Sequence, residues 1–248
     1  AHKHVDIVEE NITYSCKNNL LSILNILNLS NIFDVNNFIF ISTDKAVRPS
    51  NVMGLTKRCG EILTYFYSQK NSNKNYSSVR FGNVIGSSGS LLEILKRQIS
   101  NGGPITLTDK RASRFFMTIS DAVSLVLKGA ALKINGKILV LNMGNSINIY
   151  DLIKSFLKEN KLTEKNLQNK DGDIEVKLIG LRKGEKLHEE LFYSENYIKQ
   201  DKMIFSESID EKYRNINILE FEKNLKEKII NNSESDIQSF LKDFANLK

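Results

Sequence analysis

The chain has 248 residues, of which 41% are hydrophobic and 26% are charged, and its formal net charge is +6. A chain of this length can bury the core of one large domain or of two small ones. Its basic residues are dispersed, which argues against nucleic-acid binding, while the positive balance fits an anionic ligand such as a diphosphate. No segment is apolar over the roughly 18 residues that a membrane-spanning helix needs. The two cysteines, Cys16 and Cys59, are too few for a disulfide framework.

Helical and strand-like patterns alternate along the sequence. In chain order we expect a helix over 6–30, a buried strand over 38–41, a helix over 52–69, a strand over 78–81 and a helix over about 90–100. The pattern continues with a strand over 105–108, a helix over 119–132, a strand over 137–142, a helix over 149–159, a strand over 175–179 and two helices after 217. Such alternation indicates a parallel sheet that is covered by helices on both faces.

The number of strands is small for a doubly wound fold. A complete sheet of this kind has about six strands, and the first 85 residues supply two. We therefore expect an α/β fold: a partial Rossmann-like doubly wound parallel sheet without its N-terminal strands, and a smaller C-terminal α/β substrate-binding region. The predicted division assigns residues 1–88, with a return segment at about 119–145, to the Rossmann domain. It assigns residues 89–248 to the substrate-binding region and the C-terminal helices.

The densest group of reactive side chains follows the strand over 38–41. Residues 42–45, Ser-Thr-Asp-Lys, bring hydroxyls, a carboxylate and an amine to its carboxyl end, where open α/β sheets bind ligands. In the helix that follows, Lys57 lies four residues after Met53 and therefore on the same face. A hydroxyl at a strand end that faces a Tyr-x-x-x-Lys helix is the short-chain dehydrogenase arrangement, and Met53 stands in the place of the tyrosine.

The sequence around this group resembles the polysaccharide-biosynthesis (CapD-like) branch of the nucleotide-sugar 4,6-dehydratases, in the stretch STDKAVRPSNVMGLTKR at 42–58. That branch belongs to the extended short-chain dehydrogenases/reductases and includes members with Met in place of Tyr. The similarity continues through VRFGNVIGSSGS at 79–90, SRFFMTISDA at 113–122 and GLRKGEKLHEEL at 180–191. The opening AHKHV at 1–5 is similar to the family's segment after its fourth strand. The resemblance thus covers nearly the whole chain in order.

The resemblance implies a redox-neutral dehydration of a UDP-sugar, expected to be UDP-N-acetylglucosamine, that supplies capsule, O-antigen or a related glycan. In the family, NAD takes a hydride from sugar C4, the ketone acidifies the C5 proton, water leaves across C5–C6, and the hydride returns to C6. Carried over, Asp44 is the acid for the 6-hydroxyl, Lys45 the candidate base at C5 and Thr43 the contact to the 4-hydroxyl. Lys57 would hold the nicotinamide ribose of NAD, with NADP not distinguished. Met53 cannot transfer a proton, so another group or a water must deprotonate the 4-hydroxyl.

The glycine-rich turn at 82–89 follows a strand and could be taken for a dinucleotide-binding loop. Its spacing is Gly-x-x-x-Gly-x-x-Gly, and no acidic residue ends a strand about 20 residues later, so that interpretation is weak. In the family the matching turn meets the nucleotide sugar, with Asn83 as the substrate contact. The helix that begins near Ser90 would aim its N-terminal amides at the diphosphate.

The remaining expected contacts are single residues at positions that match the family. Arg114 and Arg182 are candidates for the diphosphate and the nucleotide, because a guanidinium matches phosphate in two-point geometry. Glu185 would accept hydrogen bonds from ribose hydroxyls. Lys3 matches a substrate position, and Asn19 matches a cofactor position.

Several expectations concern what accompanies the chain. The three histidines have no metal-ligand spacing, so no metal is expected. The family's opening strand and NAD-pyrophosphate loop do not precede Ala1, so we expect a part of a longer protein that binds NAD poorly alone. We expect a homo-oligomer in the cytoplasm or at the cytoplasmic face of the inner membrane, without nucleic-acid partners. A nucleotide-sugar 4-epimerase and a non-catalytic sugar-nucleotide-binding fragment stay open as alternatives.

Overall fold

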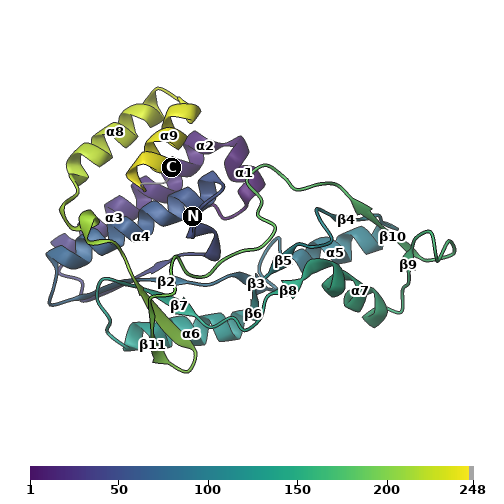
Figure 1. The fold of residues 1–248 in the computed structure, drawn as a ribbon. Helices are drawn as coiled ribbons and strands as arrows, with labels where there is room; N and C mark the ends of the chain where they lie inside the picture. Colours follow the sequence, from purple (N-terminus) through teal and green to yellow (C-terminus); the bar gives the residue numbers. More distant parts are fainter. Residues whose placement is uncertain (246–248) are drawn as a thin grey trace. The chain divides into compact units, whose positions relative to one another are not determined.

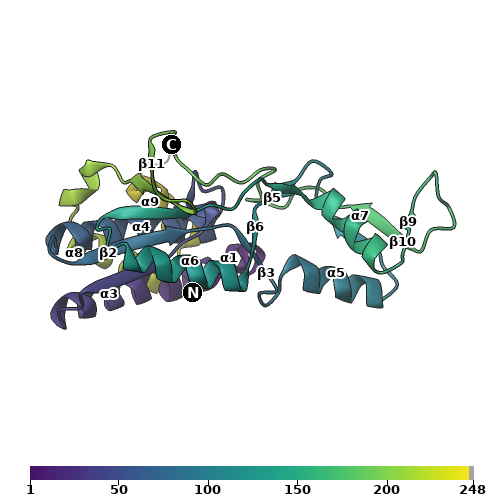
Figure 2. The same ribbon diagram turned by 90° about the horizontal axis from the view of Figure 1, so that it is seen from below.

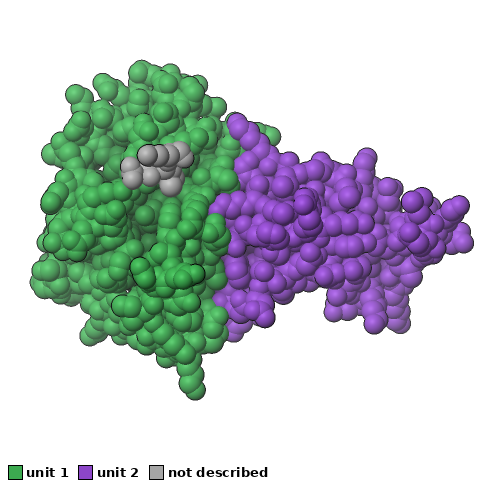
Figure 3. Space-filling model, viewed as in Figure 1, with its two compact units in different colours: residues 1–81, 124–142, 190–248 green, residues 82–123, 143–189 purple. Residues whose placement is uncertain are grey.

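The computed structural model describes residues 1–245, which fold into two compact units (Figure 3). Unit 1 comprises residues 1–81, 124–142 and 190–248, and unit 2 comprises residues 82–123 and 143–189. The C-terminal helices therefore belong to unit 1, whereas the sequence analysis groups them with the substrate-binding region. Within residues 1–245, no helix combines the length and apolarity that crossing a bilayer requires.

Unit 1 is built on a five-stranded sheet with the order β1-β2-β7-β12-β11 (Figures 1 and 2). β1 (Asn37–Ile41), β2 (Asn75–Arg80) and β7 (Lys137–Leu141) are parallel, as predicted for an α/β fold. β12 (Ile204–Ser208) pairs antiparallel with β7, and β11 (Tyr197–Asp201) pairs antiparallel with β12. These two added strands were not predicted from the sequence.

Helices cover both faces of this sheet (Figures 1 and 2). α4 (Val52–Lys70) lies on one face, where a Cβ atom at Gly60 would come within 2.4 Å of the Phe40 ring. α6 (Ile119–Ala131) lies on the other face, where Gly129 meets side chains of β2 and β7. Glycine at 60 therefore lets α4 pack closely on the sheet. This close packing sets the distance between Lys57, near the start of α4, and the carboxyl ends of the strands.

The prediction of one unbroken helix over 6–30 is wrong, because the segment is helical but interrupted. The segment forms α1 (Val5–Glu10), α2 (Ile12–Cys16), a π-helical turn (Lys17–Leu21) and α3 (Ser22–Ile32). The break falls at Asn11, where φ is −141° and ψ is 53°. The Ile12 amide donates to Glu234 Oε1 at 3.1 Å, so a partner from the far end of the chain satisfies the start of α2. The apolar stripe runs across the break, which is why periodicity alone reads as one helix.

The two helices expected after 217 are confirmed as α8 (Ile218–Ile230) and α9 (Glu234–Phe244). Their buried residues join one hydrophobic core with α1, α2 and α4 (Figure 1). Leu241 is fully buried there, and its carbonyl lies 3.8 Å from the Cys59 Sγ atom of α4. The C-terminal pair thus stabilises the same helices that carry the candidate site.

Unit 2 has a small parallel sheet of its own with the order β4-β10-β9. Its core lies between this sheet and two helices, α5 (Leu91–Ser100) and α7 (Ile149–Glu159). The strands are β4 (Ile105–Leu107), β9 (Glu164–Lys165) and β10 (Ile174–Leu178). Two short pairs complete the unit: β3 (Asn83–Ile85) with β6 (Phe116–Thr118), and β5 (Ser113–Arg114) with β8 (Ile147–Asn148).

Candidate active site

The turn at 42–46 begins where β1 ends and is tied to the neighbouring strand β2. The Ser42 amide donates to the Val79 carbonyl at 2.7 Å, and the Asp44 amide donates to the Phe81 carbonyl at 3.0 Å. Residues Asp44–Ala46 then form a short 3₁₀ helix, η2. The reactive side chains of this turn therefore sit at the carboxyl end of the parallel strands, where such sheets bind ligands.

Thr43, Asp44 and Lys45 form one hydrogen-bonded cluster. Asp44 Oδ1 accepts from Thr43 Oγ1 at 2.8 Å and from Lys45 Nζ at 2.9 Å. The Asp44 side chain is fully buried, whereas that of Lys45 is 18% exposed. Among the described residues, nothing donates a hydrogen bond to the second oxygen, Oδ2, although it is buried. Buried polar atoms are nearly always paired, so Oδ2 marks a place where a ligand hydroxyl or a proton would be accommodated.

The first turn of α4 packs directly on the backbone of this cluster. A Cβ atom at position 54 would lie 2.1 Å from the Lys45 carbonyl oxygen, so only glycine fits there. The Asn51 side chain accepts from the Gly54 amide at 2.8 Å and caps the helix. The helix start and the turn are thus held in one arrangement.

Lys57 reaches the same strand end but contacts backbone and not Asp44. Its Nζ donates to the Ile41 carbonyl at 2.8 Å and lies 4.9 Å from the centroid of the Phe40 ring. Burial lowers the pKa of Lys57 to about 8, and the nearby Glu61 carboxylate opposes this shift. The Lys57 amine thus lies at the carboxyl end of the sheet as a hydrogen-bond donor. A ribose hydroxyl that took the place of the Ile41 carbonyl would accept its hydrogen bond.

The lowered pKa of Lys57 is expected to appear in its reactivity. Acylation of the folded chain across about pH 6–10, read lysine by lysine by mass spectrometry, should give a Lys57 rate that is half-maximal near pH 8 and level above about pH 9. In the urea-unfolded chain the same amine should titrate near about 10.4. Because the folded pKa is the lower one, the unfavourable contribution of Lys57 to stability fades as pH rises from about 8. A folded-state rate that still climbs beyond pH 9 would contradict the assignment.

Three other residues of unit 1 were predicted to line the site: Met53, Asn19 and Lys3. The first two are buried and the third is exposed. Met53 is 3% exposed and packs in the main hydrophobic core. Asn19 lies in the π-helical turn and is buried; its Nδ2 donates to Thr56 Oγ1 at 3.2 Å and to the His2 carbonyl at 3.1 Å. Lys3 is exposed. Their roles in chemistry stay predictions.

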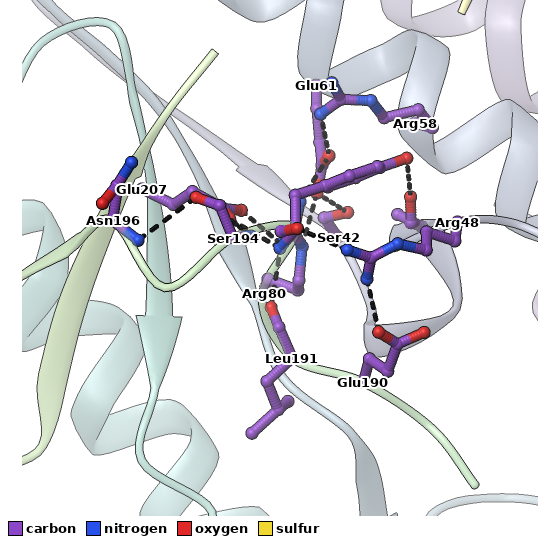
Figure 4. Close-up of polar contacts among 12 residues, drawn as sticks. Ser42, Arg48, Arg58, Glu61, Arg80, Glu190, Leu191, Ser194, Asn196 and Glu207 are labelled. Atoms are coloured by element: carbon purple, nitrogen blue, oxygen red, sulfur yellow. Dashed lines mark hydrogen bonds and ion pairs between the residues drawn. The ribbon is translucent and has the colours of Figure 1, made fainter. Parts of the chain in front are cut away.

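A buried ion-pair network that was not predicted from the sequence joins Arg80, Glu61 and Glu207 (Figure 4). Arg80 Nη2 lies 2.8 Å from Glu61 Oε2, and Arg80 Nη1 lies 2.8 Å from Glu207 Oε2. Arg58 adds a second ion pair to Glu61 at 3.1 Å, and Ser42 Oγ donates to Glu61 Oε1 at 2.7 Å. Burial raises the pKa of Glu61, but Arg80 and Arg58 outweigh it and hold that pKa below its ordinary value.

In unit 2, Arg114 and Glu185 form an ion pair in which Arg114 Nη2 lies 2.8 Å from Glu185 Oε1. Arg114 Nη1 also donates to the Leu187 carbonyl at 3.1 Å, and Thr108 Oγ1 donates to Glu185 Oε1 at 3.0 Å. The Arg182 amide donates to Glu185 Oε2 at 3.2 Å, while the Arg182 residue is exposed. Arg114, from the stretch at 113–122, therefore lies beside Arg182 and Glu185 of the motif at 180–191 and braces the loop that carries them.

The glycine-rich turn of unit 2 leads from β3 into α5. Gly86 and Gly89 have φ angles of 79° and 69°, which glycine adopts without strain. The hydroxyl of Ser90, at the helix start, is buried without a hydrogen-bond partner among residues 1–245. The Gly89 amide donates to Glu93 Oε2 at 2.7 Å, so this carboxylate now occupies a position that an anion could take. Asn83 is partly buried in β3.

The sequence also contains a literal Tyr-x-x-x-Lys spacing at 150–154. Tyr150 and Lys154 fit Tyr-x-x-x-Lys, but they lie on α7, where Tyr150 bonds Glu164 at 2.9 Å and Lys154 pairs with Asp151 at 2.6 Å. In the part of the chain that the structure describes, no three His, Cys, Asp or Glu residues gather as a metal site.

Comparison with known proteins defines the class. A family model described as polysaccharide biosynthesis protein matches residues 1–210. The capsular polysaccharide biosynthesis protein CapD of Staphylococcus aureus is 44% identical over 77% of this chain and 31% of its own length. The UDP-N-acetylglucosamine 4,6-dehydratase (inverting) of Campylobacter jejuni is 33% identical over 79% of this chain and 55% of its own. The UDP-glucose 4-epimerase of Rickettsia rickettsii is 33% identical over 74% of this chain and 51% of its own.

Among solved structures, the crystal structure of Pen from Bacillus thuringiensis superimposes with a TM-score of 0.76 at 29% identity. It covers 85% of this chain and 64% of the Pen chain. The chain belongs to the polysaccharide-biosynthesis (CapD-like) family of extended short-chain dehydrogenases/reductases, as its motifs predict. It spans between about a third and a little over half of the length of the three curated relatives named above.

Proposed function

We propose that this chain carries the catalytic turn and the nucleotide-sugar-binding region of a nicotinamide-dependent nucleotide-sugar 4,6-dehydratase, with UDP-N-acetylglucosamine as the substrate. The observation that carries the proposal is that the two oxygens of the Asp44 carboxyl group have different surroundings. Its Oδ1 is bound by Thr43 and Lys45, and its buried Oδ2 accepts no hydrogen bond within residues 1–245. An acid that must deliver a proton to a departing hydroxyl needs such a shielded oxygen that is not already committed.

The three clustered side chains have distinct proposed roles. Asp44 Oδ2 donates a proton to the departing 6-hydroxyl, and the Lys45 amine takes the C5 proton. Lys45 holds Asp44 Oδ1 at 2.9 Å, so its amine must leave that carboxylate to reach the sugar. That movement would also uncover Asp44, because Lys45 is the partly exposed member of the pair. Thr43 Oγ1 contacts the 4-hydroxyl.

A nicotinamide cofactor fits one feature of unit 1. The Lys57 amine stands at the carboxyl end of β1 on a backbone carbonyl, a contact that ribose hydroxyls can replace. When bound, the cofactor, NAD or NADP, would accept the hydride from sugar C4 and return it to C6. The 4-hydroxyl proton would leave to a water, and the proton that Lys45 takes from C5 would return to C5 as the hydride adds at C6. Lys57 would orient the ribose, and Met53, packed in the core, would exchange no proton.

The sugar nucleotide fits the motif residues of unit 2. Arg182, exposed beside the braced Arg114–Glu185 pair, would bind the diphosphate, and Glu185 would accept a bond from a ribose hydroxyl. At the start of α5 the Ser90 hydroxyl, which has no hydrogen-bond partner within residues 1–245, and the helix amides would bind phosphate oxygens once Glu93 moves aside. Asn83 would contact the sugar.

Product analysis tests the proposal. The natural gene product incubated with UDP-N-acetylglucosamine and NAD should give a UDP-sugar lighter by one water, detected by mass spectrometry, with a 4-ketone that reduces with borohydride. Calorimetry with each ligand separately should show binding of the UDP-sugar. A product of unchanged mass with inverted C4 would instead identify a 4-epimerase.

The epimerase is the second candidate, because UDP-glucose 4-epimerases of Rickettsia are also related to this chain. Two features count against it. Position 53, where an epimerase needs a tyrosine, holds a buried methionine, and the Asp44–Lys45 pair would have no evident task. UDP-sugar binding without any turnover would favour a third possibility, a non-catalytic binding fragment.

A further inference from the structure

A late segment of the chain, Glu190–Ser194, lies against the turn at 44–48 within unit 1 (Figure 4). The Tyr193 hydroxyl donates to the Ala46 carbonyl at 3.2 Å. The Arg48 guanidinium pairs with the Glu190 carboxylate and donates through Nη2 to the Tyr193 carbonyl at 2.5 Å. We call Glu190–Ser194 the strap; its contacts begin two residues after Asp44.

The strap is fixed to the buried ion-pair network. Arg80 Nη1 donates to the Leu191 carbonyl at 2.8 Å, and the Tyr193 amide donates to Glu207 Oε1 at 2.6 Å. The Tyr193 ring also lies over the Arg58 guanidinium, 4.4 Å from its Cζ atom to the ring centroid. Tyr193 is therefore held by its amide, its carbonyl and its ring, which leaves its hydroxyl aimed at one atom of the turn.

The backbone of the turn needs such support. Arg48 has a φ of 39°, a left-handed conformation that is unfavourable for a residue with a side chain. Such strain persists only where the surroundings impose it. The Arg48 guanidinium bonds the strap at two places, the Glu190 carboxylate and the Tyr193 carbonyl, so the strap holds the exit of the turn in this conformation.

We propose that Tyr193 is a positioning residue that holds Thr43, Asp44 and Lys45 in place through the Ala46 carbonyl. The effect on turnover rests on the proposed dehydratase function, whereas the effect on the turn does not. Tyr193 touches no reacting atom in this role; it limits the freedom of the peptide that carries the acid and the base.

Tyr193→Phe removes the hydroxyl and keeps the ring, the amide and the carbonyl. Tyr76→Phe is the matched control, because the Tyr76 hydroxyl also donates to a backbone carbonyl, that of Val35 at 3.1 Å, in the same unit. Hydrogen exchange of the 42–48 peptide in the full natural protein should become about fivefold faster in Tyr193→Phe, as expected for the loss of one hydrogen bond. The control should leave this peptide unchanged.

Arg48→Gln gives an independent variant that keeps the phenol and removes the ion pair with Glu190; it should accelerate exchange of the same peptide. In the dehydratase assay, Tyr193→Phe should lower kcat about fivefold with little change in KM for the UDP-sugar. Equal exchange of 42–48 in Tyr193→Phe and wild type would overturn the proposal, as would unchanged kcat in an active enzyme. If the wild type makes no 4-keto product, the proposed function fails, and the exchange experiment still decides whether the strap holds the turn.

Discussion

Asp44→Asn is expected to lower the rate of water elimination by about 10²–10⁴-fold, the usual contribution of a positioned general acid. The amide has nearly the shape of the carboxyl group and can keep an oxygen toward Thr43 and Lys45, which now bind Oδ1. It cannot deliver a proton to the departing 6-hydroxyl. Mass spectrometry should therefore show almost no product lighter by one water.

The same variant separates the roles of Asp44 and Lys45. If Lys45 is the base at C5, incubation in deuterium oxide should still exchange the C5 proton of the substrate while elimination is blocked. Asp243→Asn, an exposed carboxylate on α9, serves as the control and should retain full activity. Wild-type elimination rates in Asp44→Asn would remove Asp44 from the mechanism.

Arg80→Met should destabilise unit 1 by about 3–5 kcal/mol, because it leaves buried carboxylates without their main partner. Arg80 and Glu61 are completely buried, and Glu207 is nearly so. The Glu61 pKa is held low by Arg80 and Arg58, so that stabilisation is present above the unfolded pKa and is lost as pH falls. The loss caused by Arg80→Met should accordingly be larger at pH 7 than at pH 4 in denaturant unfolding.

An exposed ion pair provides the comparison for this experiment. Arg111 pairs with Asp109 at 2.8 Å but its side chain is 73% exposed, so Arg111→Met should leave the free energy of unfolding nearly unchanged. Adding Glu207→Gln to Arg80→Met should recover part of the stability, because it neutralises the buried carboxylate whose ion-pair partner Arg80 has been removed. A loss from Arg80→Met as small as that from Arg111→Met would show that the network contributes little.

The sequence was sufficient for the parts of the fold that local patterns determine. The parallel strands β1 and β7 are short apolar runs, and α7 has the predicted bounds of 149–159. The antiparallel β11 and β12 could not be found this way, because β11 is mostly exposed and polar and β12 carries Glu207 inside the sheet. A buried glutamate is stable only beside Arg80, 127 positions earlier, which no local pattern reveals.

The candidate site shows the same division. Thr43, Asp44 and Lys45 adjoin in sequence, so their clustering at the strand end could be predicted, and the motif at 180–191 did place Arg182 and Glu185 together. That Lys57 would bind the Ile41 carbonyl depends on the packing of α4 on β1. The contribution of Tyr193 was not predicted, because a tyrosine after a recognised motif has no distinguishing pattern of its own.

Unit 1 is assembled from three separate stretches of chain, residues 1–81, 124–142 and 190–248. On the ribosome, β1 and β2 emerge long before β7, and α9 leaves the exit tunnel last among the described elements. The apolar faces of α2 and α4 must therefore wait for their covering helices until residues 218–244 have been made. Long-range topologies of this kind fold slowly and expose hydrophobic surface meanwhile, so newly made chains should depend on chaperones more than a protein with local contacts.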